Sequence, residues 1–188
     1  MKAKSKFGDV CMAKIERSVH TKSGLKLGGV FIAECERDGK IIWREEVHNI
    51  ATNEGLDAIL DIMFHASTQI TTWYLLLTDA AETAAAGMTY GTPVFSESSA
   101  YTEANRPAWG EGASSSQSMT NATAADFTSN ATTTFYGAAL VGGGTDADTK
   151  DDQAGGGTLY AYSEFPSERS VVSGDVVHLT YTLTSADN

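Results

Sequence analysis

The sequence has little cysteine, little positive charge beyond residue 48 and no long apolar run. Its 188 residues include only two cysteines, Cys11 and Cys35, so no disulfide framework is expected, and a chain of this length buries a core without one. The apolar run WYLLL at 73–77 is far shorter than the roughly 20 residues that span a bilayer. The N-terminal residues lack the apolar segment of a secretory signal peptide. These absences predict one domain, made in a reducing cytoplasm, with no membrane span.

The scarce positive charge is unevenly distributed. Residues 1–48 hold ten Lys/Arg and seven Asp/Glu, whereas residues 49–188 hold three and seventeen, giving net charges of +3 and −14. An anionic body repels phosphate backbones, so we expect no nucleic-acid partner for it. Lys2, Lys4 and Lys6 form a short basic arm, which we interpret as a solvated tail. The alternatives are an arm that contacts nucleic acid and an arm that docks on an acidic partner surface.

Recognisable catalytic motifs are also missing. The four histidines, His20, His48, His65 and His178, are far apart and match no metalloprotease pattern, and no serine lies in a GxSxG elbow. We interpret both cysteines as small buried apolar residues, because a metal or redox pair would need further ligands or closer spacing. The sequence therefore predicts a non-enzymatic protein with no catalytic residue, metal or cofactor.

One acidic loop, GTDADTKDDQAGGG at 144–157, offers oxygen ligands for a hard cation. Its carboxylates belong to Asp146, Asp148, Asp151 and Asp152. The loop departs from the EF-hand pattern, because Lys150 occupies a ligand position, Asp151 replaces the turn glycine and Gly157 replaces the closing glutamate. We favour an acidic loop without calcium and keep a calcium site as the alternative.

Paired carboxylates suggest one enzymatic alternative. Glu103 and Glu111 lie in the same segment as Arg106 and Trp109. Two such carboxylates can act on a glycan as acid and base, but any acidic protein contains similar pairs by chance. We keep a glycan-acting enzyme as a minor alternative.

Two strands near the N-terminus are predicted to form a hairpin. Residues 29–37 and 40–48 alternate apolar and polar side chains, and Asp38-Gly39 between them suits a tight primed turn. Residues 9–19 alternate in the same way, with Cys11, Ala13, Ile15 and Val19 on one side, and predict a further half-buried strand. We treat residues 1–48 as an arm and hairpin that extend or join the body.

A single amphipathic helix is predicted at about 53–65. It begins near Thr52 or Asn53, which can cap its first turn. Its apolar positions follow helical spacing: Leu56, Ile59, Leu60, Met63 and Phe64. We expect this stripe to face the hydrophobic core.

The rest of the body, residues 49–188, is predicted to be strands joined by long loops. Strands are expected at 70–78, 132–143, 158–165 and 175–184, the last preceded by a turn at Gly174-Asp175. Residues 79–133 are rich in Ala, Thr, Ser and Gly with isolated aromatic anchors, which predicts long loops with short strands, the most flexible at 112–125. One helix among many strands favours a mainly β fold: an antiparallel β-sandwich or jelly-roll-like barrel.

The order and wording of these segments resemble structural proteins of tailed-bacteriophage particles. The similar segments span about residues 47–184 and include HNIATNEGLDAILDIMF, TTWYLLL, the E-x-x-R segment from Glu103 to Arg106, FYGAALV, GGTLYAYSEF and SGDVVHLTYTL. The resemblance implies a small β domain that oligomerises, as a dimer or trimer, and attaches to the virion. It implies no catalytic residues.

Among such proteins we expect a capsid decoration protein, located on the capsid surface, that binds and bridges major capsid subunits. The single-domain length and the absence of shaft repeats or heptads favour decoration over a tail or head fibre. The fibre or receptor-binding alternative expects host contacts through loop aromatics such as Tyr101 and Trp109.

Overall fold

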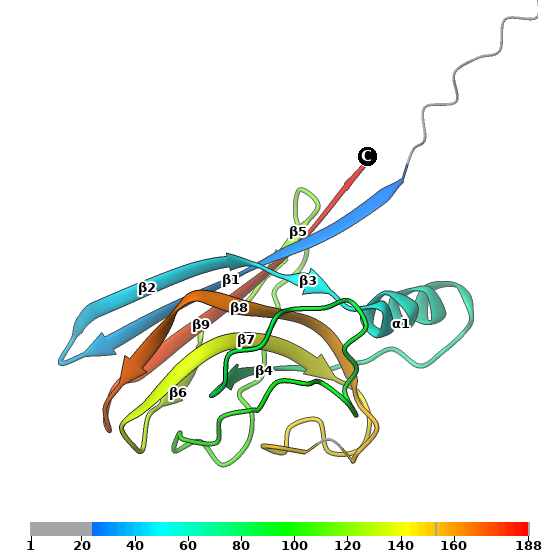
Figure 1. Ribbon diagram of the computed structural model, residues 1–188. Helices are drawn as coiled ribbons and strands as arrows, with labels where there is room; N and C mark the ends of the chain where they lie inside the picture. The colour runs from blue at the N-terminus through cyan, green and yellow to red at the C-terminus, as the bar shows by residue number, and fades with distance from the viewer. Residues whose placement is uncertain (1–23, 153, 188) are drawn as a thin grey trace, which may run out of the picture.

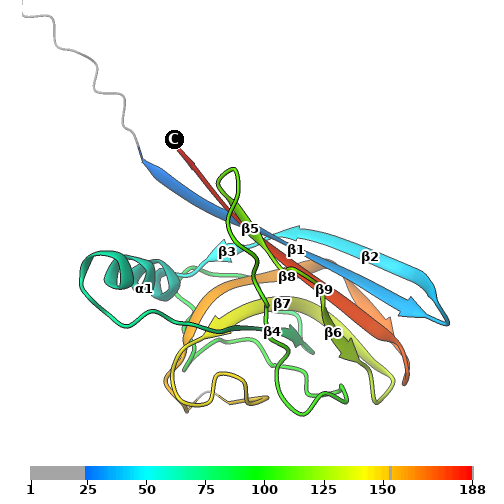
Figure 2. The same cartoon turned by 180° about the vertical axis from the view of Figure 1, so that it is seen from behind.

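Two antiparallel sheets face each other, with one helix at one end of the pair (Figures 1 and 2). The computed structural model describes residues 24–152 and 154–187. One sheet has the order β2-β1-β9-β5, with β6 also paired to β9, and the other has the order β3-β8-β7-β4. The prediction of a mainly β antiparallel fold with one short helix is confirmed, and the two sheets are consistent with a sandwich.

The elements have the following bounds. The strands are β1 (Leu25–Arg37), β2 (Lys40–His48), β3 (Ile50–Ala51), β4 (Trp73–Thr78), β5 (Ser118–Thr120), β6 (Ala125–Thr128), β7 (Thr133–Gly142), β8 (Thr158–Val171) and β9 (Val176–Asp187). The helix is α1 (Asn53–Phe64). No helix in the described part of the chain is long and apolar enough to cross a membrane.

The predicted hairpin is confirmed. β1 and β2 pair in antiparallel register from Val30↔His48 to Arg37↔Lys40. Asp38 and Gly39 both have positive φ, 50° and 75°, as a primed turn that follows the strand twist requires. The predicted strand at 9–19, with Cys11, lies outside the described residues, as do the basic arm and His20.

β9 is the central strand of its sheet. It pairs with β1 along one edge, from Leu25↔Asp187 to Glu36↔Val176, and with β5 and β6 along the other. The N-terminal end of β1 and the C-terminal end of β9 run together beyond the body as a two-stranded ribbon (Figure 1). The ribbon therefore brings both ends of the described chain to one place.

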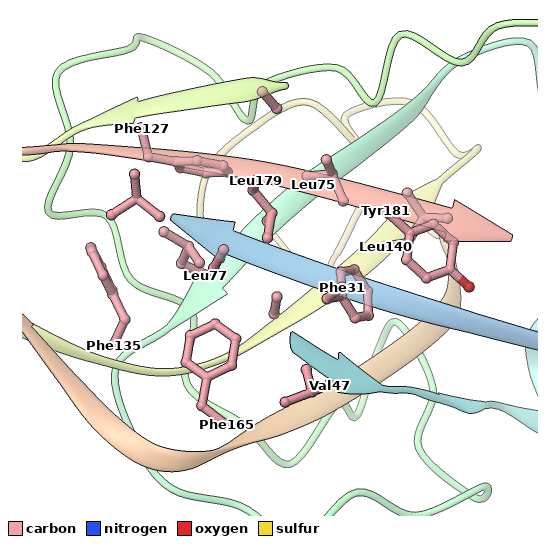
Figure 3. Packing of buried hydrophobic residues seen from close by; sticks show 14 of the residues in the cluster. Phe31, Val47, Leu75, Leu77, Phe127, Phe135, Leu140, Phe165, Leu179 and Tyr181 are labelled. Atoms are coloured by element: carbon pink, nitrogen blue, oxygen red, sulfur yellow. The ribbon is translucent and has the colours of Figure 1, made fainter. Parts of the chain in front are cut away.

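The main core fills the space between the sheets. Large side chains from both layers meet there, including Phe31, Leu75, Phe127, Phe135 and Tyr181, all fully buried (Figure 3). Phe31 and Tyr181 lie on paired strands with ring centroids 4.4 Å apart. Strand alternation sends these residues inward, as the predicted period-two pattern requires.

A second apolar cluster lies on the opposite face of the β3-β8-β7-β4 sheet. Leu76, Val141 and Tyr162 of the sheet pack there with Tyr90 and Phe95, which come from the segment after β4. This sheet is thus covered on both faces, which explains why β4 and β7 have nearly continuous apolar sequences.

The segment from 79 to 133 contains the short strands β5 and β6, as predicted. The indole Nε1 of Trp109 donates to the Tyr181 carbonyl at 2.9 Å. Asn121 accepts from the Tyr181 amide at 2.8 Å and donates to the Leu179 carbonyl at 3.2 Å. These side chains hold the segment against β9 between the positions where β5 and β6 pair with it. The greater flexibility of residues 112–125 stays a prediction.

Candidate interaction surface

The first turn of α1 is held firmly against β8. Thr52 is the N-cap: its hydroxyl accepts from the Gly55 amide at 3.0 Å and donates to the Leu159 carbonyl. The Glu54 carboxylate accepts from the amides of Tyr90 at 2.8 Å and Leu159 at 2.7 Å. The cap that the sequence predicted is therefore confirmed, and it also joins the helix to the sheet.

Gly55 allows the close approach of α1 to β8. A Cβ atom at this position would lie 2.7 Å from the Tyr160 Cα, closer than real side chains come to backbone atoms. Gly55 is also the single buried residue of α1. The side of the helix that carries Gly55 thus faces the body.

The prediction that the stripe on α1 faces the core is wrong for its second half. At about 100° per residue, Leu60 and Phe64 lie about 140° and 180° around the helix from Gly55. Their exposed fractions are 55% and 81%, and that of Met63 is 66%. We call these three residues the outer patch. The spacing identified an apolar face correctly, but the close contact at Gly55 turns most of that face outward.

An apolar groove lies between α1 and the open end of the two sheets. It has a volume of about 360 Å³. Its walls come from α1 and from both sheets, and include Ile59, Met63, Trp73, Tyr160, Met119 and Leu183. Met63 therefore belongs to both the groove and the outer patch. The core of the described domain is open at this end.

A buried ion pair holds the long loops together on the far side of the β3-β8-β7-β4 sheet. The side chains of Arg106 and Glu97 are each 3% exposed, and Arg106 Nη2 lies 2.6 Å from Glu97 Oε2. Arg106 also donates to the Tyr90 hydroxyl, the Ala147 carbonyl and the Asp152 carbonyl. Burial alone would lower the pKa of Arg106, but the bonds to Glu97 outweigh it and raise the pKa. The pair is structural.

Three of the four aspartates of the acidic loop bind separate protein partners. Asp152 accepts from the amides of Ala154 and Gly155 and from the Tyr90 hydroxyl, whereas Asp148 accepts from Asn105 at 2.6 Å. Asp146 accepts from the neighbouring Thr145 hydroxyl. Among the described residues, no three His, Cys, Asp or Glu side chains are grouped as metal ligands. The alternative of a preformed calcium site has no geometric support in this loop.

The structure does not bring Glu103 and Glu111 together. Glu103 accepts from the Thr128 amide, and Thr128 pairs with Val176. Glu111 bridges to Asn121, whose side chain binds the Tyr181 amide. Val176 and Tyr181 are five residues apart on β9, about 16 Å, so the two glutamates are anchored at different positions along this strand.

The two loop aromatics expected to contact a host are buried. Tyr101 is 1% exposed and Trp109 is 3% exposed. The Tyr101 ring packs edge-on against Phe127, and Lys150 Nζ lies 3.7 Å from the Tyr101 ring centroid. The expectation that these residues form a receptor-binding surface is therefore wrong, because both serve the core.

All three cations of the acidic body are engaged inside the protein. Arg106 pairs with Glu97, Lys150 donates to the Tyr101 carbonyl at 2.8 Å, and Arg169 pairs with Glu45. The Lys and Arg residues of the described chain that remain lie on the β1-β2 hairpin. The surface contributed by residues 49–187 is consequently anionic.

The described histidines lie far from one another. His48 ends β2, His65 follows α1 as its C-cap, and His178 lies on the outer face of β9. His178 Nδ1 is 2.7 Å from Asp126 and Nε2 is 3.4 Å from Glu36. Burial alone would lower the pKa of His178, but these two carboxylates raise it above its usual value.

No protein-family model matches the chain, and neither does any curated protein. What the protein does must therefore be inferred from its own surface and sequence. The feature that burial within the described chain leaves unexplained is the apolar end formed by α1, the outer patch and the groove.

Proposed function

We propose that this chain is a structural protein of a tailed-phage particle, and most specifically a capsid decoration protein that oligomerises and binds major capsid subunits. The observation that carries the proposal is the outer patch on α1. Contiguous exposed apolar side chains on a well-packed domain mark contacts with other proteins. The resemblance of residues 47–184 to virion proteins leads us to propose another virion protein, the major capsid protein, as the partner.

The outer patch is suited to binding a protein surface. Burying a Leu, Met or Phe side chain completely stabilises a complex by about 1.5–3 kcal/mol before the cost of ordering the partners. The first turn of α1 is fixed to β8, so the patch is presented on a rigid element. A preorganised surface of this kind loses little conformational entropy when it binds.

The charge distribution favours a position outside a DNA-filled shell. The body has a net charge of −14 across residues 49–188, and its three cations are held in internal contacts. Such a surface repels the phosphates of packaged DNA, which disfavours a position in contact with the DNA inside a shell. A tail or fibre position, with few copies at one vertex, is the alternative that the same surface permits.

Location and copy number in intact particles test the proposal. We expect cryo-electron microscopy and quantitative mass spectrometry to find many copies spread over the capsid surface, with α1 against the major capsid protein. A few copies at one vertex would favour the tail or fibre alternative. Absence from the particle would refute the virion proposal in both forms.

A pair of variants tests the outer patch itself. Phe64→Asp places a charge at the centre of the contact, and should abolish binding to bare shells. Ile41→Asp is a matched control, because Ile41 is 50% exposed but lies on the hairpin at the opposite end of the molecule (Figure 1). Equal binding of the two variants would show that the patch does not attach the protein. Decorated shells should also melt at a higher temperature than bare shells, since binding stabilises the bound state.

A further inference from the structure

The groove beside α1 is an opening in the core, distinct from the outer patch. Trp73 and Tyr160 of one sheet and Met119 and Leu183 of the other line it, together with Ile59. Side chains of this size normally meet an apolar partner, because contact between them removes apolar surface from water. Ile59, Trp73, Met119 and Leu183 are only partly buried by the described residues.

The chain outside the structure joins the described part at the tip of the β1-β9 ribbon, about 13 Å along the strands from the position of the groove-lining Leu183. Gly29 pairs with Leu183, and Leu25 pairs with Asp187. Residues directly opposite one another in a sheet share a face, as do alternate residues of one strand. Leu25 and Leu27 therefore lie on the same face of the ribbon as Leu183, which lines the groove. Leu25 is 73% exposed. An apolar face therefore continues along the ribbon from Leu183 to the place where residues 1–23 connect to the described chain.

The sequence of that outer segment has the required chemistry. Residues 9–19 alternate, and place Cys11, Ala13, Ile15 and Val19 on one side, interrupted by Arg17. This mostly apolar edge needs a surface to cover. Residues 1–23 contain six Lys/Arg and two Asp/Glu. The groove is lined by one carboxylate, that of Glu111, and by no Lys or Arg of the described chain. The polarity and the sign of the charge of the segment therefore match those of the groove.

We propose that residues 9–19 of the same chain occupy this groove and close the core, with Ile15 and its apolar neighbours against Trp73, Met119 and Leu183. Five residues, 20–24, connect Val19 to Leu25 and span at most about 20 Å when fully extended. This reach exceeds the roughly 13 Å of ribbon between Leu25 and Gly29, which pairs with the groove-lining Leu183. Attachment through this short connection gives the segment an effective concentration in the millimolar range. Because of this high effective concentration, we favour residues 9–19 of the same chain as the occupant over residues 9–19 of a second copy.

Cross-linking in the full-length protein tests the proposal. Cys11 is the native probe, and a second thiol is placed along the groove in three separate variants, Ile59→Cys, Met63→Cys and Met119→Cys. Diamide accepts the two hydrogens that two thiols lose when they form a disulfide. Cys35 does not compete, because it is fully buried and burial raises the pKa of its thiol to about 11. Ile41→Cys, at the far hairpin, is the matched control.

We expect at least one groove variant to form a disulfide within a single chain, seen as altered mobility of a species that is still one chain, and lost when Cys11→Ala is added. The Ile41 control should form none. Disulfides between two chains only would overturn the same-chain proposal in favour of a second copy. Absence of any link above the control rate would overturn the proposal altogether.

Tryptophan fluorescence gives an independent readout that does not depend on register. Trp73 lines the groove and is only partly buried by the described residues, so displacing the segment should expose it further to water and shift its emission to the red. Ile15→Asp should produce this shift, whereas Ser18→Asp, on the other side of the alternation, should not. Identical spectra for the two variants would contradict the proposal. Both tests use the isolated protein, so their failure would leave the decoration proposal untouched.

Discussion

Replacing Arg106 with alanine should destabilise the protein more than any substitution of a surface charge. The change leaves the Glu97 carboxylate buried without its cation, since the Glu97 side chain is 3% exposed. It also removes donors to the Tyr90 hydroxyl and to the carbonyls of Ala147 and Asp152. Breaking one side of a buried ion pair costs about 3–5 kcal/mol.

For a domain of this size that loss corresponds to a fall in Tm of roughly 10 °C. Thermal unfolding followed by circular dichroism measures it, and denaturant titration gives the free energy of unfolding. Arg44→Ala is the matched control: Arg44 contacts Glu34 and Glu46 at the surface, where its side chain is 46% exposed. We expect a much smaller change in Tm for that variant.

A double variant separates the ion pair from the shape of the site. Replacing both Arg106 and Glu97 with leucine removes the two charges together, and should recover part of the stability that Arg106→Leu alone loses. Equal Tm values for Arg106→Ala and Arg44→Ala would refute the conclusion that Arg106 is a buried structural cation. A double variant no better than the single one would show that the neighbouring hydrogen bonds, rather than the unpaired carboxylate, determine the loss.

Three further predictions follow from local geometry. Gly55→Ala should displace α1 from Tyr160 and lower the Tm, whereas Gly87→Ala, where a Cβ meets nothing within 4 Å, should leave the Tm nearly unchanged. The raised pKa of His178 means that its stabilising contribution is complete below about pH 6.5, the usual value, and is lost as the pH rises through the folded-state value. His178→Asn should therefore flatten this part of the profile of Tm against pH, and an unaltered profile would contradict the assignment. In a Cys11→Ala background, the Cys35 thiol should react with a thiol reagent only as fast as the protein opens, so rapid labelling under native conditions would show that it is accessible.

Local chemistry made part of the fold predictable. Asp38-Gly39 fixes its own turn, and Thr52 caps the helix that follows it, because both effects act within a few residues. The alternation in β9 predicts a strand with one buried face. These features depend on short stretches of sequence and require no knowledge of what packs against them.

Long-range contacts determined what could not be predicted. Helical spacing shows that α1 has an apolar face, but the side that meets the body depends on Gly55 against Tyr160, which are 105 positions apart. The ion pair of Arg106 and Glu97 could not be predicted either. In the sequence the nearer carboxylate is that of Glu103 in the E-x-x-R pattern, whereas the structure pairs Arg106 with Glu97. The sequence did contain one signal for this pair. Residues 49–188 have only three cations, and a cation that is buried needs a carboxylate partner.

The ribbon of β1 and β9 has a mechanical consequence. Leu25 and Asp187 are neighbours across the ladder, so a force that separates the two ends of the described chain acts across the strands rather than along them. The backbone hydrogen bonds between β1 and β9 would then break one after another, starting at the tip of the ribbon, instead of resisting together. A tether at either end would hold the domain at the same point. Pulling on both ends would separate β1 from β9 sequentially, at low force.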